Sequence, residues 1–293
     1  MAGNTGPPSS WTMQRWTTAV VIAANIAFVA DYSILSESPT ITEVVAEYGK
    51  MFVPAGFAQA ICAAILVAFL LFYFDALWPR RHRIRVYDKL VIPLAMTSVL
   101  VSCWTVAFRQ KEIGLAAALV AASVVLGAVM FVRVASVSPS QHSSWLRVPF
   151  SLHFGAMTIA LLVAVTQWLN ARGLLTEIAV MPDQVAIAFL VIAAAIGGFV
   201  ALRYNDFVYP AVIAAGTGAM FIAQRTYNPH VAADALIVCV GMLVVVVLAA
   251  VMLARQPRRD PKAVASRRRA RVARRAQDEG WYMIDGHSSI MRL

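Results

Sequence analysis

Ionisable side chains are scarce in the apolar segments of this 293-residue chain. Asp31 and Asp75 lie at the ends of such segments, where a carboxylate can reach water. A proton- or ion-coupled transporter needs charged groups inside the bilayer, so the sequence gives that class little support. The deeper polar residues suit hydrogen bonds between helices; they are Asn25, Gln59, His153 and Gln167.

Lysines and histidines decide which cofactors the chain could hold. A retinal Schiff base needs a lysine within a helix, and none of the four lysines meets this requirement; they are Lys50, Lys89, Lys111 and Lys262. His153 is the only one of the five histidines inside an apolar segment. It could hold one tetrapyrrole as an axial ligand or serve as an interhelical hydrogen-bonding group, and the sequence leaves the cofactor open.

The sequence carries no motif of an enzyme. We find no HExxH, GxSxG or P-loop pattern. The cysteines Cys62, Cys103 and Cys239 all lie in apolar segments, where they suit packing better than a disulfide or metal site. We therefore predict a protein that is not an enzyme, with no catalytic residue and no metal ligand.

The elements that position these residues are transmembrane helices. The chain is 60% hydrophobic and 14% charged, and its apolar residues fall in blocks of about 20, the length that crosses a bilayer as a helix. The fold class is thus an all-α, polytopic transmembrane helix bundle. Prolines such as Pro93 and Pro149 are expected near first helical turns. Eight spans are predicted, or seven if the short seventh is discounted: 16–35, 54–77, 90–108, 112–132, 148–169, 184–202, 207–223 and 235–254.

The distribution of basic residues predicts the orientation. Of the 25 lysines and arginines, 20 fall in one set of alternate connections and five in the other. Basic connections stay in the cytoplasm, so both termini are predicted to be cytoplasmic and the protein multi-pass in a bacterial inner (plasma) membrane. The acidic connection 31–53 is then external, and its apolar spacing suggests a short surface helix. The predicted parts are a cytoplasmic segment 1–15, a transmembrane domain 16–254 and a basic tail 255–293.

The tail holds 11 of the basic residues, so the basicity belongs to one segment and not to a nucleic-acid-binding fold. We expect residues 267–275 to form a helix and to meet anionic lipid or an acidic partner. Residues 280–293 are too apolar for a free solvated tail, and we expect them to fold back onto the membrane face or to dock on a protein partner. The residues expected in these contacts are Arg267, Arg268, Arg269, Arg271, Arg274, Arg275 and Trp281.

Two segments resemble the longer, many-span branch of the tryptophan-rich sensory protein family (TspO/MBR-like). Residues 52–62 read FVPAGFAQAIC and are similar to that branch's F-x-P-A-G-Y-x-F-x-I-W. Residues 147–156 read RVPFSLHFGA and are similar to its R-L-P-F-S-L-Y-L-G-W. The resemblance covers roughly residues 30–170. The motif residues that it assigns to helix starts and close packing are Phe52, Pro54, Gly56, Pro149, Phe150 and Ser151.

The resemblance implies a non-enzymatic protein that binds a flat apolar ligand, such as a tetrapyrrole, a sterol-like molecule or a lipid. The family's tryptophans are replaced by Cys62 and Ala156, an aromatic residue by Gln59, and a tyrosine by His153. We expect any ligand between spans two and five, near the outer end of span two, in reach of Gln59, Cys62, Trp104 and His153. An accessory or scaffold subunit of a membrane complex is the alternative, and a secondary transporter is the second alternative.

Overall fold

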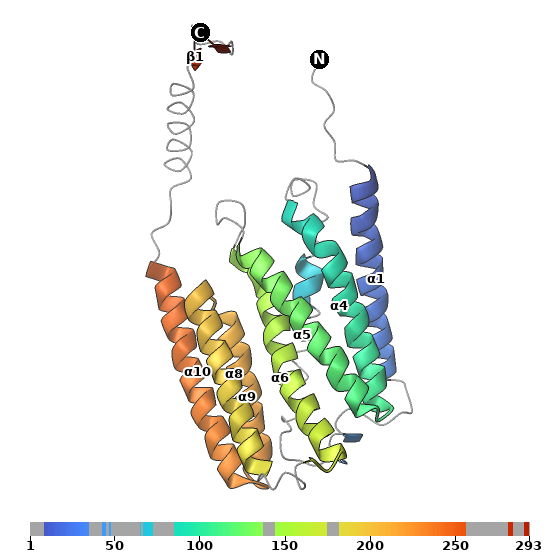
Figure 1. The fold of residues 1–293 in the computed structure, drawn as a ribbon, viewed down its shortest axis with the longest axis vertical. Helices are drawn as coiled ribbons and strands as arrows, with labels where there is room; N and C mark the ends of the chain where they lie inside the picture. The colour runs from blue at the N-terminus through green and yellow to red at the C-terminus, as the bar shows by residue number, and fades with distance from the viewer. Residues whose placement is uncertain are drawn as a thin grey trace. The chain divides into compact units, whose positions relative to one another are not determined.

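The computed structural model describes residues 9–34, 43–44, 47, 65, 67–72, 85–136, 144–174, 182–255, 281–283 and 290–292. Contacts divide the chain into two units, Met1–Leu253 and Ala254–Leu293. The described helices are α1 (Ser9–Ile34), α4 (Arg85–Arg109), α5 (Ile113–Ala135), η3 (Ser144–Arg147), α6 (Val148–Ala171), α8 (Pro182–Tyr204), α9 (Val208–Gln224) and α10 (Pro229–Arg255) (Figure 1).

The predicted spans agree with these helices, except for span 54–77. That span lies largely outside the described residues, although 65 and 67–72 are helical. Within the described part of the chain, five helices are long and apolar enough to cross a membrane: Lys89–Arg109, Ile113–Ala135, Val148–Ala171, Asp183–Tyr204 and Pro229–Arg255. The seventh predicted span is short, as expected, because Val208–Gln224 has 17 residues. The count of eight spans and their orientation remain predictions.

The expectation for Pro93 was wrong. Helix α4 begins at Arg85, so Pro93 lies inside it instead of in its first turn. The polar residues 85–89 continue the helix beyond the apolar segment, a boundary that hydropathy alone cannot place. Pro149, by contrast, occupies the first turn of α6, where its missing N–H leaves no carbonyl without a donor.

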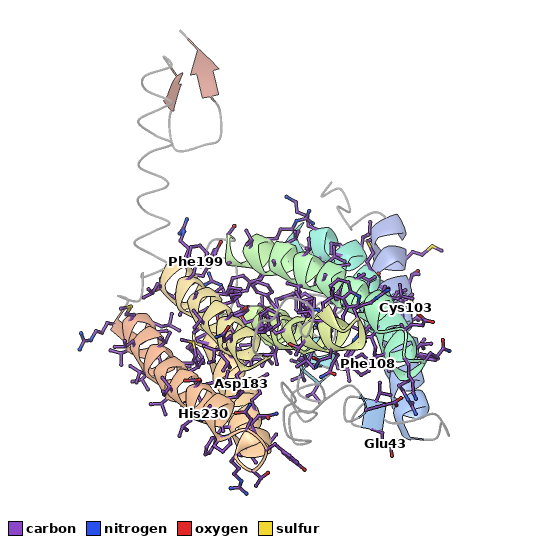
Figure 2. All side chains as sticks on the ribbon, turned by 60° about the horizontal axis from the view of Figure 1, so that its bottom comes forward. Glu43, Cys103, Phe108, Asp183, Phe199 and His230 are labelled. Atoms are coloured by element: carbon purple, nitrogen blue, oxygen red, sulfur yellow. The ribbon has the colours of Figure 1, made fainter. Side chains whose placement is uncertain are left out.

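The helices of the first unit run between two ends of the bundle. We call them the Arg147 end and the Lys111 end, after a residue that lies at each. At the Arg147 end, α5 and α8 finish and α4, α6 and α9 begin, because short connections make consecutive helices antiparallel (Figure 1). Arg147 donates to the carbonyls of Ala135 and Tyr204, over 3.4 and 3.5 Å, and so holds the last turns of α5 and α8 together. At the opposite Lys111 end, Asn228 donates to Asp183 and joins the beginnings of α8 and α10. Figure 2 labels Asp183 and His230 in the first turns of these two helices.

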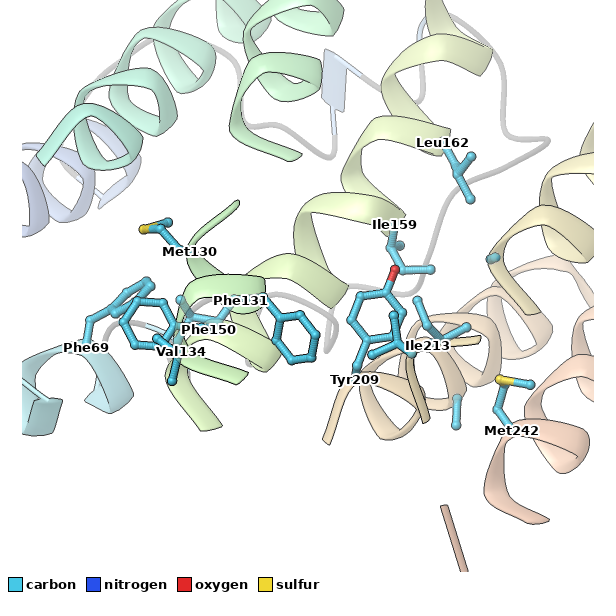
Figure 3. Packing of buried hydrophobic residues seen from close by; sticks show 14 of the residues in the cluster. Phe69, Met130, Phe131, Val134, Phe150, Ile159, Leu162, Tyr209, Ile213 and Met242 are labelled. Atoms are coloured by element: carbon cyan, nitrogen blue, oxygen red, sulfur yellow. The ribbon is translucent and has the colours of Figure 1, made fainter. Parts of the chain in front are cut away.

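Helix α6 is the most buried of the five candidate spans and packs against both α5 and α9. Its neighbours on one side are Phe131 of α5 and Phe69, and on the other side Tyr209 and Ile213 of α9 (Figure 3). Helices α1, α4, α5 and α6 pack in series, and α9 and α8 continue from α6. The core of the first unit is therefore organised around one central helix.

The tail unit contains a two-stranded antiparallel sheet. Strand β1 (Trp281–Met283) pairs with β2 (Ile290–Arg292), with Trp281 opposite Arg292 and Met283 opposite Ile290. The sequence between the strands contains Asp-Gly, a common turn dipeptide. We did not expect strands here, and the helix predicted at 267–275 lies outside the described residues.

Close packing between α6 and α9 depends on two glycines. A Cβ added at Gly155 would lie 3.0 Å from Val212 Cβ, and one at Gly216 would lie 3.0 Å from Ile159 Cγ1. A Cβ at Gly241 of α10, in contrast, would meet nothing within 4 Å. These glycines allow the two backbones to approach, as small residues do between membrane helices.

We predict that Gly155→Leu destabilises the bundle and that Gly241→Leu does not. Overpacking a tight contact costs about 1–3 kcal/mol, whereas a side chain at Gly241 enters open space. Thermal unfolding of both variants in the same detergent measures the difference. Equal midpoints for the two variants would show that the α6–α9 contact does not limit stability.

Candidate functional site

His153 lies on α6 among aromatic side chains of the core. Its ring is 2% exposed, and its centroid lies 5.5 Å from that of Phe69. A Cβ added at Gly127 of α5 would lie 3.4 Å from His153 Cδ2, so that glycine makes room for the imidazole. Among the described residues, His153 Nε2 has no hydrogen-bond partner. A buried polar atom left unpaired costs about 1–3 kcal/mol, so a histidine at this position needs a structural or functional reason.

The residues that precede His153 have structural contacts. Phe150 is fully buried and meets Phe72 edge-to-face at 5.0 Å between centroids. Ser151 donates to Asp206 Oδ2 over 2.6 Å, and both residues are buried. The motif residues Phe52, Pro54 and Gly56 lie outside the described residues.

Asp206 in turn holds the beginning of α9. Its Oδ1 accepts the backbone N–H groups of Val208 and Tyr209 over 2.9 Å each, which satisfies two donors that a helix start leaves free. Thr158 and Tyr209 share a further hydrogen bond of 2.9 Å between their hydroxyl oxygens. We name this set of contacts the Asp206 clamp. Sequence analysis did not single out Asp206, although an Asp shortly before a helix is a signal of an N-cap.

A second group of aromatic residues lies towards the Lys111 end. Trp104 and Phe108 of α4 lie 6.1 Å apart between ring centroids. Trp168 of α6 packs against the same cluster, whose other members are Val44, Ala107, Ile113, Ala116 and Leu119. Trp104 Nε1 is buried without a hydrogen-bond partner among the described residues. We name this group the Trp104 cluster.

Two described residues of the acidic connection, Val44 and Glu47, make contacts at this end of the bundle. Val44 is completely buried in the Trp104 cluster, and Glu47 pairs with Lys111 at 2.7 Å. Lys111 has a φ of 64° in the turn between α4 and α5. The helical state of 43–44 and 47 agrees with the short helix expected in this connection.

The structure does not bring Trp104 and His153 together. Trp104 is the twentieth residue of α4 and His153 the sixth of α6, and both helices begin at the Arg147 end. Trp168, which packs in the Trp104 cluster, lies 15 residues after His153 on α6, about 22 Å along that helix at 1.5 Å per residue. Gln59 and Cys62 lie outside the described residues. The sequence analysis did not single out Trp168 and Phe108. Both lie near the same ends of their predicted spans as Trp104, so their distances from the span ends would have placed all three at a similar depth.

The comparisons with known proteins give one family. The family model described as TSPO-like protein matches residues 14–252, a range that extends well beyond the segments of the sequence resemblance. No curated protein and no solved structure matches the chain.

We predict that His153→Leu leaves the stability of the bundle unchanged or raises it. Because Nε2 has no partner among the described residues, an apolar side chain removes about 1–3 kcal/mol of desolvation cost and little else. Thermal unfolding in detergent measures the effect, with Ser151→Ala, which removes a donor to Asp206, as the destabilised comparison. Destabilisation of His153→Leu by more than Ser151→Ala would contradict this interpretation.

Proposed function

The chain belongs to the TSPO-like family, and we propose that this integral membrane protein binds a flat apolar ligand without catalysing a reaction. The ligand class is a tetrapyrrole, a sterol-like molecule or a lipid. The observation that carries the proposal is the Trp104 cluster, where aromatic rings from two helices pack together and the buried Trp104 N–H has no hydrogen-bond partner among the described residues.

The chemistry of the Trp104 cluster suits such a ligand. Aromatic faces stack on flat apolar rings, and the N–H of Trp104 can donate to a carbonyl or carboxylate at the edge of the ligand. On the predicted second span, Gln59 and Cys62 fall five and eight residues after its external beginning at Pro54. Trp104 lies five residues before the end of α4, so all three are expected at a similar depth.

Axial ligation of a tetrapyrrole by His153 does not fit the described contacts. The imidazole is enclosed by Phe69 and by the close approach of α5 at Gly127. A macrocycle against Nε2 would have to displace these neighbours. The proposal therefore rests on Trp104, and His153 serves as its comparison.

The alternative is an accessory subunit of a larger complex in a bacterial inner membrane. Helix α10 supports this reading, because only 11% of its apolar window is buried and its chain continues into the tail. There Arg267, Arg268, Arg269, Arg271, Arg274 and Arg275 would meet anionic lipids, and residues 280–293, with Trp281, a protein partner. The short sheet at 281–283 and 290–292 supports a docked end of the chain. An isolated two-stranded sheet is marginal in water, so this one would need a partner surface to pack against.

We predict that Trp104→Ala weakens the binding of protoporphyrin IX about tenfold, equivalent to about 1.4 kcal/mol. Trp104→Phe should lose less, because it keeps an aromatic face but lacks the N–H. Bound porphyrin per chain, measured by absorbance after gel filtration, gives the affinity. Trp16→Ala, at an exposed position of α1, is the matched control, and His153→Leu should bind like the control.

Equal binding by Trp104→Ala and Trp16→Ala would contradict the proposed site. Native mass spectrometry of the full chain from mild detergent separates the two functions. A co-purifying pigment or lipid supports ligand binding, and stoichiometric partner chains support the accessory subunit.

A further inference from the structure

Two basic residues meet at the Arg147 end on adjacent helices. Arg133 lies in the last turn of α5, and its Nη1 donates to the backbone carbonyl of Lys89 over 3.1 Å. Lys89 lies in the second turn of α4, and both residues are exposed. We name them the Arg133–Lys89 pair.

The pair stands at the edge of the apolar part of the bundle. The apolar span of α4 begins at Lys89, and that of α5 ends at Ala135, two residues after Arg133. An apolar helix of this length matches a hydrocarbon layer about 30 Å thick. Its edge therefore lies at the depth of the lipid phosphates.

No carboxylate among the described side chains forms an ion pair with Arg133 or Lys89, and the side chain of Asp88 lies outside that set. The ion pair between Lys111 and Glu47 lies at the opposite end of the bundle. Residues 80–88, which lead into α4 and form its first turn, add positive charge, because they hold four arginines against the single Asp88. Positive charges on neighbouring helices repel each other, and an anion bound beside them offsets that repulsion.

The general enrichment of basic residues on one side of a membrane explains the sign of these charges. It does not explain a guanidinium that is held against the neighbouring helix. The bond to the carbonyl of Lys89 uses one nitrogen of Arg133, and the remaining N–H donors can address a phosphate in the paired geometry that arginine favours. Lys89, whose backbone carbonyl accepts that bond, carries a second positive charge.

We propose that the Arg133–Lys89 pair binds the phosphate of an anionic phospholipid at the edge of α4 and α5. Arg133 holds the phosphate oxygens, Lys89 adds attraction, and the acyl chains lie along the exposed apolar positions of α4 and α5. Those positions include Ile92 and Met96 of α4 and Val125, Val129 and Val132 of α5. The site is separate from the Trp104 cluster, which lies towards the other end of the same helices.

The test uses the full chain in mild detergent with phosphatidylglycerol as the anionic lipid and phosphatidylcholine as the zwitterionic one. Native mass spectrometry gives the lipids retained per chain, and thermal unfolding gives the stabilisation on lipid addition. We expect the double variant Lys89→Gln with Arg133→Gln to bind phosphatidylglycerol about tenfold more weakly than the wild type, since each basic residue contributes measurably at a membrane surface. Arg133→Lys should lose part of this affinity.

The matched control is Arg172→Gln with Arg225→Gln, which removes two exposed charges at the Lys111 end. It should retain phosphatidylglycerol like the wild type and leaves the basic tail intact. Equal retention by the two double variants would overturn the proposal. Equal stabilisation by glycerol 3-phosphate would also overturn it, because the site would then hold a free anion and not a lipid. If the double variant Lys89→Gln with Arg133→Gln has a lower unfolding temperature than the wild type in the absence of lipid, lipid retention is compared between Arg133→Lys and the wild type instead.

Discussion

The hydrogen bonds of the Asp206 carboxylate are the interaction on which the arrangement of the first unit depends. A buried polar group normally needs a hydrogen-bond partner, and Asp206 and Ser151 are both buried. Asp206 meets this requirement for three donors at once: Ser151 of α6 and the backbone N–H groups of Val208 and Tyr209. One carboxylate thereby fixes where α9 begins and how it lies on α6.

This clamp separates the structural part of α6 from the part that can serve a ligand. Ser151 and Phe150 are engaged at the Arg147 end, where Arg147 also joins α5 to α8. Trp168, near the other end of α6, packs with Trp104 under Val44. The same helix thus anchors α9 at one end and contributes to the proposed ligand site at the other, with His153 on the anchored side.

The sequence predicted the positions of the described helices because hydrocarbon thickness sets the length of an apolar helix. It predicted the family from two motifs, and the match over 14–252 confirms the family. It failed where a boundary depends on polar residues, as at Pro93. It grouped Trp104 with His153 because both lie in spans of the resemblance, although their depths differ. Asp206 was missed because its role depends on a contact with Ser151, 55 residues away in the chain, and local patterns do not report such contacts. The strands 281–283 and 290–292 were missed because apolar content alone does not distinguish a hairpin from a docked helix.

The central claim, that the Asp206 carboxylate joins α6 to α9, is tested most directly by a double-mutant cycle. Unfolding free energies of the wild type, Ser151→Ala, Asp206→Ala and the double variant give the coupling between the two side chains. The account predicts a coupling of about 1.5–2 kcal/mol, within the range for a hydrogen bond to a charged group and above the average between membrane helices. Additive effects of the two substitutions, with no coupling, would contradict it.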